Sequence, residues 1–214
     1  GLDNTIRSVE YVVNRSAGEP RREVRREPQQ NAFLDLGTLY IDKRDNLNPR
    51  YTFDTFVVGP FNQLAHAAAR PVVERPGLTY NPFFVYGSTG HGKTHLIQAV
   101  GNHFKKNHSN KKVFYVSSER FAVDFINSIQ KGRANEFKDQ YRQYDVLIMD
   151  DIQFMAEKER TQEELFHVFN ALHSEGKQLV FASDRSPKQL HGLEDRLRSR
   201  FEGGLVVEMQ APDR

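Results

Sequence analysis

Residues 83–94 read FFVYGSTGHGKT, and this stretch determines the fold that the sequence predicts. The apolar run 83–86 predicts a buried strand, and the glycine-rich part after it matches the pattern G-x-x-x-x-G-K-[ST]. Backbone N–H groups of such a loop surround a phosphate, which requires glycine where a Cβ would intrude or where φ is positive. Lys93 supplies a cation to the β- and γ-phosphates, and the Thr94 hydroxyl is a ligand for Mg²⁺. We therefore expect these residues to bind a nucleotide: Gly87, Ser88, Thr89, Gly90, His91, Gly92, Lys93, Thr94 and His95.

A second apolar run ends in two carboxylates, as a nucleotide site of this kind requires. Residues 146–151 read VLIMDD. Asp150 is expected to hold the magnesium ion through water, and Asp151 to orient the attacking water. Many ATPases with this loop carry Glu at the second position, and Asp is one methylene shorter. We therefore predict slow hydrolysis that depends on Lys93, Asp150 and Asp151, with Thr94 and Asp150 at the metal.

Five short apolar runs predict the sheet. Their positions are 83–86, 113–116, 146–149, 179–182 and 205–207. Each run is continuous and not alternating, which is typical of strands covered on both faces. The segments between them are long enough for crossover helices. The sequence therefore predicts an α/β fold with a parallel five-stranded sheet flanked by helices.

Two local signals predict where helices begin and end. Residues 161–164 read TQEE, a capping box that would begin a helix, and Gly176 is a plausible stop for it. Pro71 interrupts the Ala-rich stretch 63–70. An interior proline costs a helix about 3 kcal/mol, so we expect a kink or an early end near Arg70.

Composition excludes several classes of protein. The chain has 214 residues, with 30 Lys+Arg against 28 Asp+Glu and a net charge of +2, which excludes a polybasic binder that acts through bulk charge. The absence of Cys excludes a disulfide scaffold, a thiolate zinc site and a Cys nucleophile. No stretch approaches the roughly 20 apolar residues of a membrane span, so a cytoplasmic setting is expected.

The chain divides into two regions of different composition. Residues 14–30 contain one apolar residue larger than Ala, too little to offset the entropy of ordering. We interpret residues 1–48 as a flexible linker and 49–214 as a nucleotide-binding α/β domain. A solvated helix held by Arg/Glu pairs is the alternative for 14–30. Because the chain stops at residues 210–214 without a closing element, we expect it to be a piece of a longer protein.

Polar residues near the C-terminus allow two interpretations each. Asp184 follows the run 179–182, where a side chain could sense a γ-phosphate or simply cap a helix. Arg196 and Arg200 share one helix face. They form either a salt-bridged surface helix or a source of guanidinium groups for the γ-phosphate of a neighbouring subunit.

The motifs taken together resemble the AAA+ ATPase domain of the DnaA family, the bacterial chromosomal replication initiators. The resemblance covers residues 48–214, about three quarters of the chain. It rests on NQLA at 62–65, YNP at 80–82, the loop with its two following residues at 87–96, SERF at 118–121, DDIQF at 150–154, TQEE at 161–164, FNAL at 169–172 and LEDRLRSRF at 193–201. It implies a P-loop NTPase fold that uses ATP or ADP with Mg²⁺.

The resemblance also implies roles for individual residues. Val57, Val58 and Gly59 would lie against the adenine. Asp184 would be a sensor of the γ-phosphate, Arg196 a further nucleotide-contacting residue, and Arg200 the arginine finger that completes the next subunit's catalytic site. Residues 118–142 would form a helical insertion through which ATP-bound subunits stack. The residues expected to touch single-stranded DNA are Ile126, Lys158, Arg160 and Thr161.

The implied function is ATP-dependent initiation of chromosomal replication. ATP binding would drive assembly into a helical oligomer on origin DNA and engagement of the single strand, and slow hydrolysis would reset the protein. Duplex origin boxes would be read only by a C-terminal domain outside this chain. The lid subdomain would also lie outside it. A replicative helicase would be a further partner. The alternative is an AAA+ ATPase that resembles helicase loaders or regulates the initiator, and that acts through a protein partner.

Overall fold

The computed structural model describes residues 41–210. Most of the predicted linker therefore lies outside the described residues. The elements are α1 (Gln63–Glu74), β1 (Phe83–Tyr86), α2 (Lys93–Asn107), β2 (Val113–Ser117), α3 (Ser118–Gln130), α4 (Ala134–Arg142), β3 (Val146–Asp150), η2 (Ile152–Met155), α5 (Glu159–Ser174), β4 (Gln178–Ser183), η3 (Pro187–Gln189), α6 (Asp195–Glu202) and β5 (Leu205–Glu208).

The five predicted strands form one sheet in the order β2-β3-β4-β1-β5, and every pairing is parallel. The predicted α/β fold is therefore confirmed. Strand β1, which leads into the glycine-rich loop, lies between β4 and β5. Because all strands are parallel, their carboxyl ends meet at one edge of the sheet, which is where open α/β sheets bind ligands.

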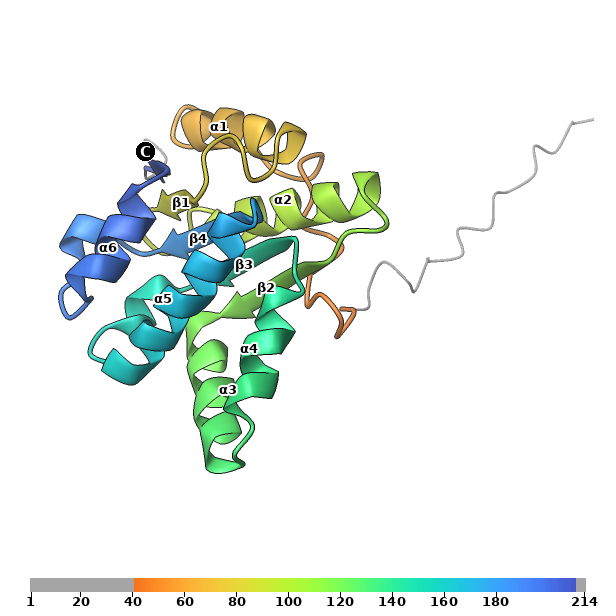
Figure 1. The fold of residues 1–214 in the computed structure, drawn as a ribbon. Coiled ribbons are helices and arrows are strands. Elements are labelled where there is room, and N and C mark those ends of the chain that lie inside the picture. Colours follow the sequence, from red (N-terminus) through yellow and green to blue (C-terminus); the bar gives the residue numbers. More distant parts are fainter. Residues whose placement is uncertain (1–40, 211–214) are drawn as a thin grey trace, which may run out of the picture. The chain divides into compact units, whose positions relative to one another are not determined.

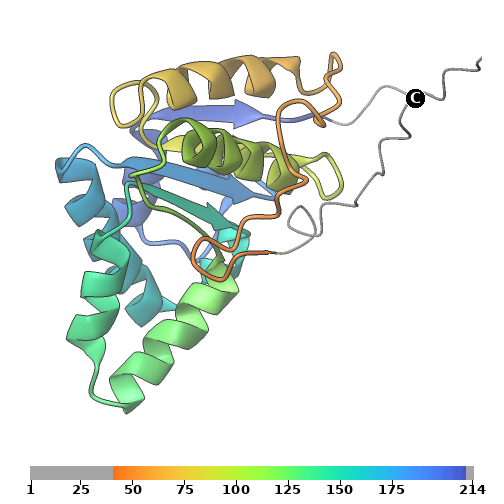
Figure 2. The same ribbon diagram turned by 90° about the vertical axis from the view of Figure 1, so that its right-hand side faces the viewer.

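Helices cover both faces of the sheet (Figures 1 and 2). On one face, α1 and α2 pack on Phe83 and Val85 of β1 and on their neighbours. On the other face, α3, α4, α5 and α6 pack on Phe84, Phe181 and the residues around them. Successive residues of one strand thus enter different cores. This is the physical reason why the strands read as continuous apolar runs.

Helices α3 and α4 lie side by side and extend away from the sheet (Figures 1 and 2). Together they span residues 118–142, where the sequence predicted a helical insertion. Aromatic rings join them, with the Phe121 ring centroid 5.3 Å from that of Phe137 and 5.0 Å from that of Tyr141. The pair therefore has an apolar core of its own, continuous with the core under α5.

The sequence predicted a kink or an early end of this helix near Arg70, and the early end is wrong. Helix α1 includes Pro71 and continues to Glu74. The two residues after the proline, Val72 and Val73, are only 1% and 5% exposed. Burial of a valine side chain contributes about 1.5–3 kcal/mol, so two of them offset the roughly 3 kcal/mol that an interior proline costs.

The predicted capping box is also wrong. Helix α5 begins at Glu159, two residues before Thr161, because the Gln162 N–H already donates to the Lys158 carbonyl at 2.9 Å. Thr161 is 4% exposed and caps nothing. The predicted stop is confirmed, since Gly176 follows α5 with φ of 70°. The N–H groups of Gly176 and Lys177 close the helix by donating to the carbonyls of His173 and Leu172.

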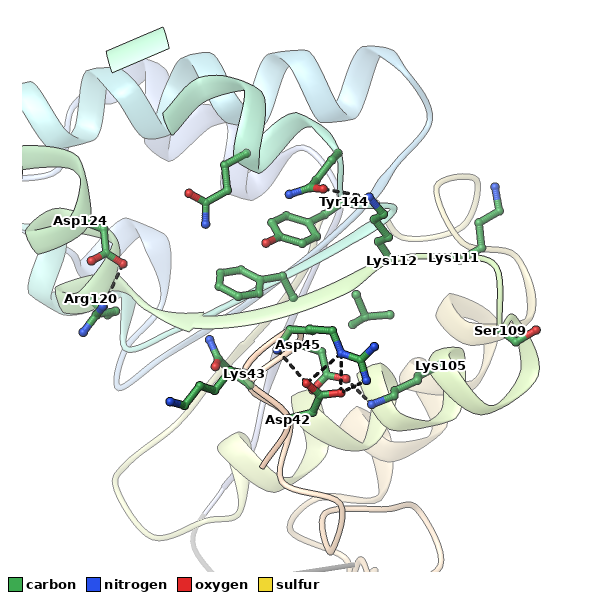
Figure 3. A pocket seen from close by; sticks show the side chains of 16 residues that line it. Asp42, Lys43, Asp45, Lys105, Ser109, Lys111, Lys112, Arg120, Asp124 and Tyr144 are labelled. Atoms are coloured by element: carbon green, nitrogen blue, oxygen red, sulfur yellow. Dashed lines mark hydrogen bonds and ion pairs between the residues drawn. The ribbon is translucent and has the colours of Figure 1, made fainter. Parts of the chain in front are cut away.

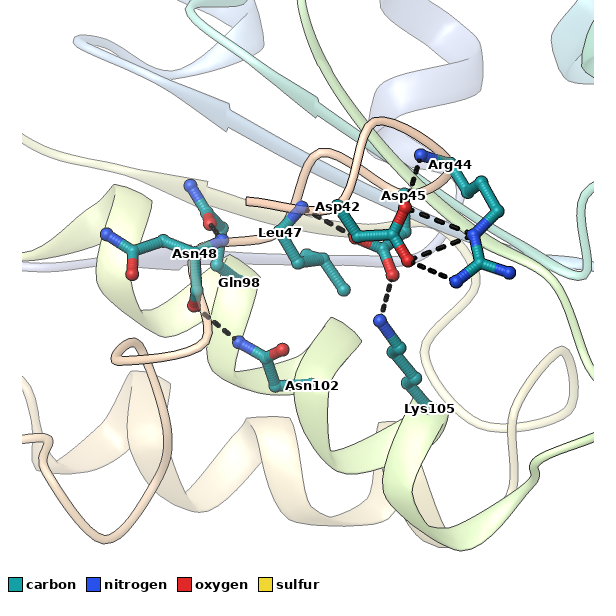
Figure 4. A network of polar contacts seen from close by, with 8 residues as sticks. All are labelled: Asp42, Arg44, Asp45, Leu47, Asn48, Gln98, Asn102 and Lys105. Carbon is teal, nitrogen blue, oxygen red and sulfur yellow. Dashed lines mark hydrogen bonds and ion pairs between the residues drawn. The ribbon is translucent and has the colours of Figure 1, made fainter. Parts of the chain in front are cut away.

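Residues 41–48 fall within the predicted linker, yet part of this segment packs on the domain. Leu47 is 2% exposed. The Asp45 carbonyl accepts a 2.8 Å hydrogen bond from the Tyr115 N–H on the edge strand β2. The Asn48 N–H donates to Gln98 Oε1 at 2.7 Å, and Asn102 Nδ2 donates to the Asn48 carbonyl at 2.8 Å (Figure 4). The ordered domain therefore begins before residue 49.

Candidate nucleotide site

The glycine-rich loop connects β1 to α2 in a conformation that needs its glycines. Gly87, Gly90 and Gly92 have φ of 153°, 86° and 84°. At Gly87 a Cβ would lie 2.2 Å from the Met209 carbonyl oxygen, so no other residue fits without displacement of the backbone. Beside the loop is a cavity of about 360 Å³, and its lining residues are Tyr51, Thr89, Gly90, Gly92, Lys93, Thr94, His95, Asp150, Asp151, Gln153 and Asp184.

Not every predicted loop residue faces this cavity. Gly87 and Ser88 line a neighbouring hollow instead. His91 lines neither hollow, and its Nδ1 lies 3.3 Å from the Met209 carbonyl oxygen. His95 does line the cavity, and Tyr51 stacks on its ring at 4.8 Å between centroids. The loop sequence thus predicted which residues surround the cavity, but not the direction of each side chain.

Lys93 and Thr94 begin α2 directly below the loop. Lys93 Nζ donates to the Ser88 carbonyl at 2.9 Å. Burial lowers the pKa of Lys93, while the nearby carboxylates Asp150, Asp151 and Asp184 oppose that shift. A cation surrounded by three acids and a curled backbone is suited to a phosphate chain that carries its own metal ion.

Asp150 is the most buried carboxylate of the site, at 2% exposed. Its Oδ2 accepts hydrogen bonds from the Thr94 hydroxyl at 2.6 Å and from the Tyr115 hydroxyl at 3.0 Å. Its Oδ1 accepts one from the N–H of Asp151 at 2.8 Å. A hydroxyl and a carboxylate lie side by side here, and both are hard oxygen donors of the type that Mg²⁺ prefers. The residues present therefore fit the predicted metal.

Asp151 occupies a strained position at the end of β3. Its φ and ψ are 57° and 45°, in the left-handed region. Gln153 Nε2 donates to Asp151 Oδ1 at 3.1 Å, and burial, followed by the charge of Asp150, raises the pKa of Asp151. Left-handed backbone outside glycine is found preferentially at functional sites.

Gln153 connects the ends of two strands. Its Oε1 accepts hydrogen bonds from the Ser183 hydroxyl at 3.3 Å and from the N–H of Asp184 at 3.2 Å. The Asp184 side chain lines the cavity and pairs with Arg185 at 2.8 Å. It does not cap a helix, because the N-cap of the following η3 is Ser186. The helix-cap interpretation of Asp184 is therefore wrong, and its role as a sensor stays a prediction.

Residues 57–59 lie outside the phosphate cavity. Val57 and Val58 are 78% and 48% exposed. Buried Asn62 holds the segment, since its Oδ1 accepts from the Gly59 N–H at 2.9 Å and its Nδ2 donates to the Val57 carbonyl at 2.9 Å. The segment thus presents exposed apolar side chains on a fixed backbone.

Arg196 and Arg200 do not line their own chain's phosphate cavity. Both are exposed on α6, with their guanidinium carbons 4.9 Å and 5.6 Å from the centre of the Phe166 ring. Arg196 also pairs with Glu194 at 2.6 Å. Arg200 is therefore exposed at the surface, and Arg196 contacts Glu194 and Phe166 in the single chain, so the predicted nucleotide contact of Arg196 stays a prediction.

Three of the four residues predicted to touch single-stranded DNA are at the surface. Ile126 on α3 is 48% exposed, and Lys158 and Arg160 are exposed at the start of α5. Thr161 is 4% exposed, so its side chain does not join them. Two exposed apolar side chains that the sequence did not single out are Val123 on α3 and Phe154 on η2, at 52% and 45%.

A larger hollow of about 940 Å³ lies along the edge strand β2 and contains none of the predicted site residues (Figure 3). Its carboxylates are already paired with cations of the same hollow, Asp42 with Arg44, Asp45 with Lys105 and Asp124 with Arg120.

Within residues 41–210 there is also no cluster of three or more His, Cys, Asp or Glu side chains suited to a metal. None of the helices in this range has the length and apolarity needed to cross a membrane.

Sequence reasoning missed three residues that shape the site, Tyr115, Gln153 and Asn62. Gln153 and Asn62 were part of the recognised motifs, but no role followed from the motifs alone. Tyr115 was treated only as a strand residue, although a tyrosine near the end of an otherwise aliphatic and aromatic run is a sign that a hydroxyl is needed there.

Comparison with known proteins agrees with this geometry. A family model described as bacterial DnaA ATPase domain matches residues 47–208. Domain III of the Thermotoga maritima replication initiation protein DnaA is 49% identical, with a TM-score of 0.76, over 78% of this chain and 70% of that one. AMPPCP-bound DnaA from Aquifex aeolicus is 49% identical, with a TM-score of 0.74, over 77% of this chain and 51% of that one.

A third structure, replication initiator DnaA bound to AMPPCP and single-stranded DNA, is 48% identical, with a TM-score of 0.75, over 78% of this chain and 52% of that one. This chain thus spans about half the length of the last two proteins. The match of the family model to most of the described residues and the identity near one half lead to one conclusion: the chain belongs to the DnaA family of replication initiators, and residues 47–208 are its AAA+ ATPase domain.

Proposed function

We propose that this chain is the ATP-switched part of an initiator of chromosomal replication. The single observation that carries the proposal is the 2.6 Å hydrogen bond from Thr94 to Asp150 beneath the loop, which brings the phosphate-binding and metal-binding halves of an ATPase together. ATP or ADP would occupy the cavity with Lys93 at the phosphates. The adenine would lie on Val57, Val58 and Gly59, whose backbone is fixed by hydrogen bonds to Asn62.

Hydrolysis would be slow and would serve as a timer. Thr94 and Asp150 would hold Mg²⁺, which would supply positive charge to the β- and γ-phosphates. Asp151 would orient the attacking water, with its carboxylate held by Gln153, and Asp184 would sense the γ-phosphate. We expect turnover below about 1 per second for this chain. Asp151→Asn should keep ATP affinity while it lowers the rate of phosphate release, and an unchanged rate would remove Asp151 from the mechanism.

Assembly would complete the catalytic site. Arg200 is exposed on α6 and lies outside the cavity of its own chain, as an arginine finger that acts on the next subunit must. We propose the same direction for Arg196, with Glu194 as its partner in the free subunit. The projecting pair α3–α4 would supply the stacking surface of a helical oligomer.

Single-stranded DNA would bind beside that pair. Ile126 offers an apolar surface to a sugar or base, and Lys158 and Arg160 offer contacts to phosphates. A relative that is 48% identical is described as bound to AMPPCP and single-stranded DNA. Because Thr161 is buried, we propose that it supports the surface formed by Lys158 and Arg160.

Other parts of the proposal concern the longer protein. We propose that residues 1–48 include a linker that ends where Leu47 packs on the domain, and that 49–214 hold the nucleotide-binding subdomain. Duplex origin boxes would be read by a C-terminal domain beyond this chain. The protein would act in the cytoplasm, with the replicative helicase as a further partner.

The first test is fluorescence anisotropy of a labelled oligo-dT with ATP, with ADP and without nucleotide. ATP-dependent binding is the expected result and locates the switch within this chain. Binding that ignores nucleotide would contradict the switch. No binding in any state, together with measured ATP affinity, would favour an ATPase that acts through a protein partner.

A further inference from the structure

Tyr115 reaches the metal-binding carboxylate from a neighbouring strand. In the parallel register of β2 and β3, Ser117 pairs with Asp150, so Tyr115 lies two residues earlier on β2. Its side chain extends along the strand, and its hydroxyl donates to Asp150 Oδ2 at 3.0 Å. None of the loop motifs that identify the site includes this residue.

The need for such a donor follows from the burial of Asp150. A carboxylate that is 2% exposed loses nearly all of its hydration and must be compensated by hydrogen bonds. Two side chains supply them at Oδ2, Thr94 and Tyr115. Thr94 is itself expected to bind the metal, so its hydroxyl has two tasks. Tyr115 has only this one.

The surroundings of Tyr115 fix both its position and its proton. Its backbone is held to the segment before α1, since its N–H donates to the Asp45 carbonyl at 2.8 Å and its carbonyl accepts from Asn46 Nδ2 at 3.2 Å. The Asp150 carboxylate oxygen can only accept, so the Tyr115 hydroxyl is the donor of this hydrogen bond.

We propose that Tyr115 is the positioning residue of this ATPase: it holds the Asp150 carboxylate in the orientation that receives Mg²⁺ with ATP. The inference rests on the proposed function, because it names the residue that prepares the same site. Tyr115 does not line the nucleotide cavity. Its loss should therefore affect the metal-dependent part of binding and the chemical step, and leave metal-free binding unchanged.

The test compares Tyr115→Phe with wild type and with Tyr144→Phe in the 214-residue chain. Tyr144 is a matched control, because it is 6% exposed and its ring stacks on Phe114, the neighbour of Tyr115, without touching the nucleotide cavity. The measurements are ATP affinity by calorimetry in EDTA and in Mg²⁺, kcat and KM for hydrolysis, and the melting temperature.

For Tyr115→Phe we expect unchanged affinity in EDTA, a loss of roughly tenfold in the gain that Mg²⁺ confers and a fall of similar size in kcat, since a hydrogen bond to a charged group is lost. KM in saturating Mg²⁺ should change less than kcat. Tyr144→Phe should match wild type in all four binding and rate measurements. Equal Mg²⁺ dependence and kcat in Tyr115→Phe and wild type would overturn the proposal, as would an equal loss of affinity with and without Mg²⁺.

The test stays decisive if Tyr115→Phe melts at a much lower temperature. All measurements are then made at a temperature at which both variants and the wild type are folded, and the affinity in EDTA serves as the internal control. A general loss of folded protein would lower the affinity equally with and without Mg²⁺, which is the pattern that overturns the proposal. Absence of ATP binding in the wild type would instead contradict the proposed function, and the inference with it.

Discussion

The carboxyl edge of the sheet and the projecting pair α3–α4 are built by different forces. At the sheet edge, Asp150, Asp151 and Gln153 are joined by hydrogen bonds of 2.6–3.3 Å to residues from neighbouring strands and from α2. In the projecting pair, packing of aromatic rings on one side holds the helices, while Val123 and Ile126 remain half exposed on the other. Directional bonds fix a site before its ligand arrives, whereas non-directional packing leaves a surface for partners.

The largest effect should come from the sheet edge. Lys93→Ala removes the cation that is expected at the phosphates, and we expect a loss of ATP affinity of roughly 100-fold or more, since charged hydrogen bonds contribute up to about 3 kcal/mol. Calorimetric titration measures it. Lys106→Ala, in the last turn of the same helix, is the control and should bind ATP like wild type. ATP affinity unchanged in Lys93→Ala would refute the assigned site.

Arg200→Ala separates the two regions, because it should leave the cavity of the single chain intact. ATP affinity of the monomer should stay within about twofold, and ATP-dependent assembly, followed by light scattering, should be lost. The matched control is Arg70→Ala on α1, where a guanidinium lies 5.4 Å from the Phe53 ring in a comparable contact. Assembly that persists in Arg200→Ala would exclude it as the finger.

Replacement of Lys158 and Arg160 should have a smaller effect, on the salt dependence of single-strand binding. If Lys158 and Arg160 each contact a phosphate, replacing both by Ala should lower the slope of log K against log salt by about 1.4, at roughly 0.7 per contact on a single strand. Anisotropy with oligo-dT at several salt concentrations gives this slope. Lys111→Ala with Lys112→Ala, in the hollow along β2, removes the same charge elsewhere and should leave the slope unchanged.

The same contrast explains what the sequence could predict. The loop and the five strands were readable because glycines at fixed spacing and unbroken apolar runs have few alternatives. The bond from Tyr115 to Asp150 was not readable, since it depends on β2 and β3 being neighbours, and sequence order does not give the strand order β2-β3-β4-β1-β5. Local rules failed where tertiary burial outweighed them, at Pro71 in α1 and at Thr161 in α5.

A buried carboxylate on α5 faces the projecting pair. The Glu164 side chain on α5 is 6% exposed, and within the described residues its Oε1 has no hydrogen-bond partner. Its other oxygen is 3.8 Å from Lys138 Nζ on α4. Burial raises the pKa of Glu164, so its carboxyl group binds a proton more tightly in the folded state than in the unfolded chain. Stability should therefore rise as the pH falls through the raised pKa toward the ordinary value.

The smallest predicted effect follows from this geometry. Glu164→Gln should raise the melting temperature at pH 8 by about 2–4 °C, on the order of 1 kcal/mol for a domain of this size, because a poorly compensated buried charge is removed. The advantage should vanish below about pH 4.5, where the glutamate is protonated in both states. Glu163→Gln changes the same charge at an exposed neighbour and should have no such effect. A lower melting temperature of Glu164→Gln at pH 8 would mean that the contact with Lys138 outweighs burial. In that case an electrostatic attachment, in addition to ring packing, joins the projecting pair to the ATPase core.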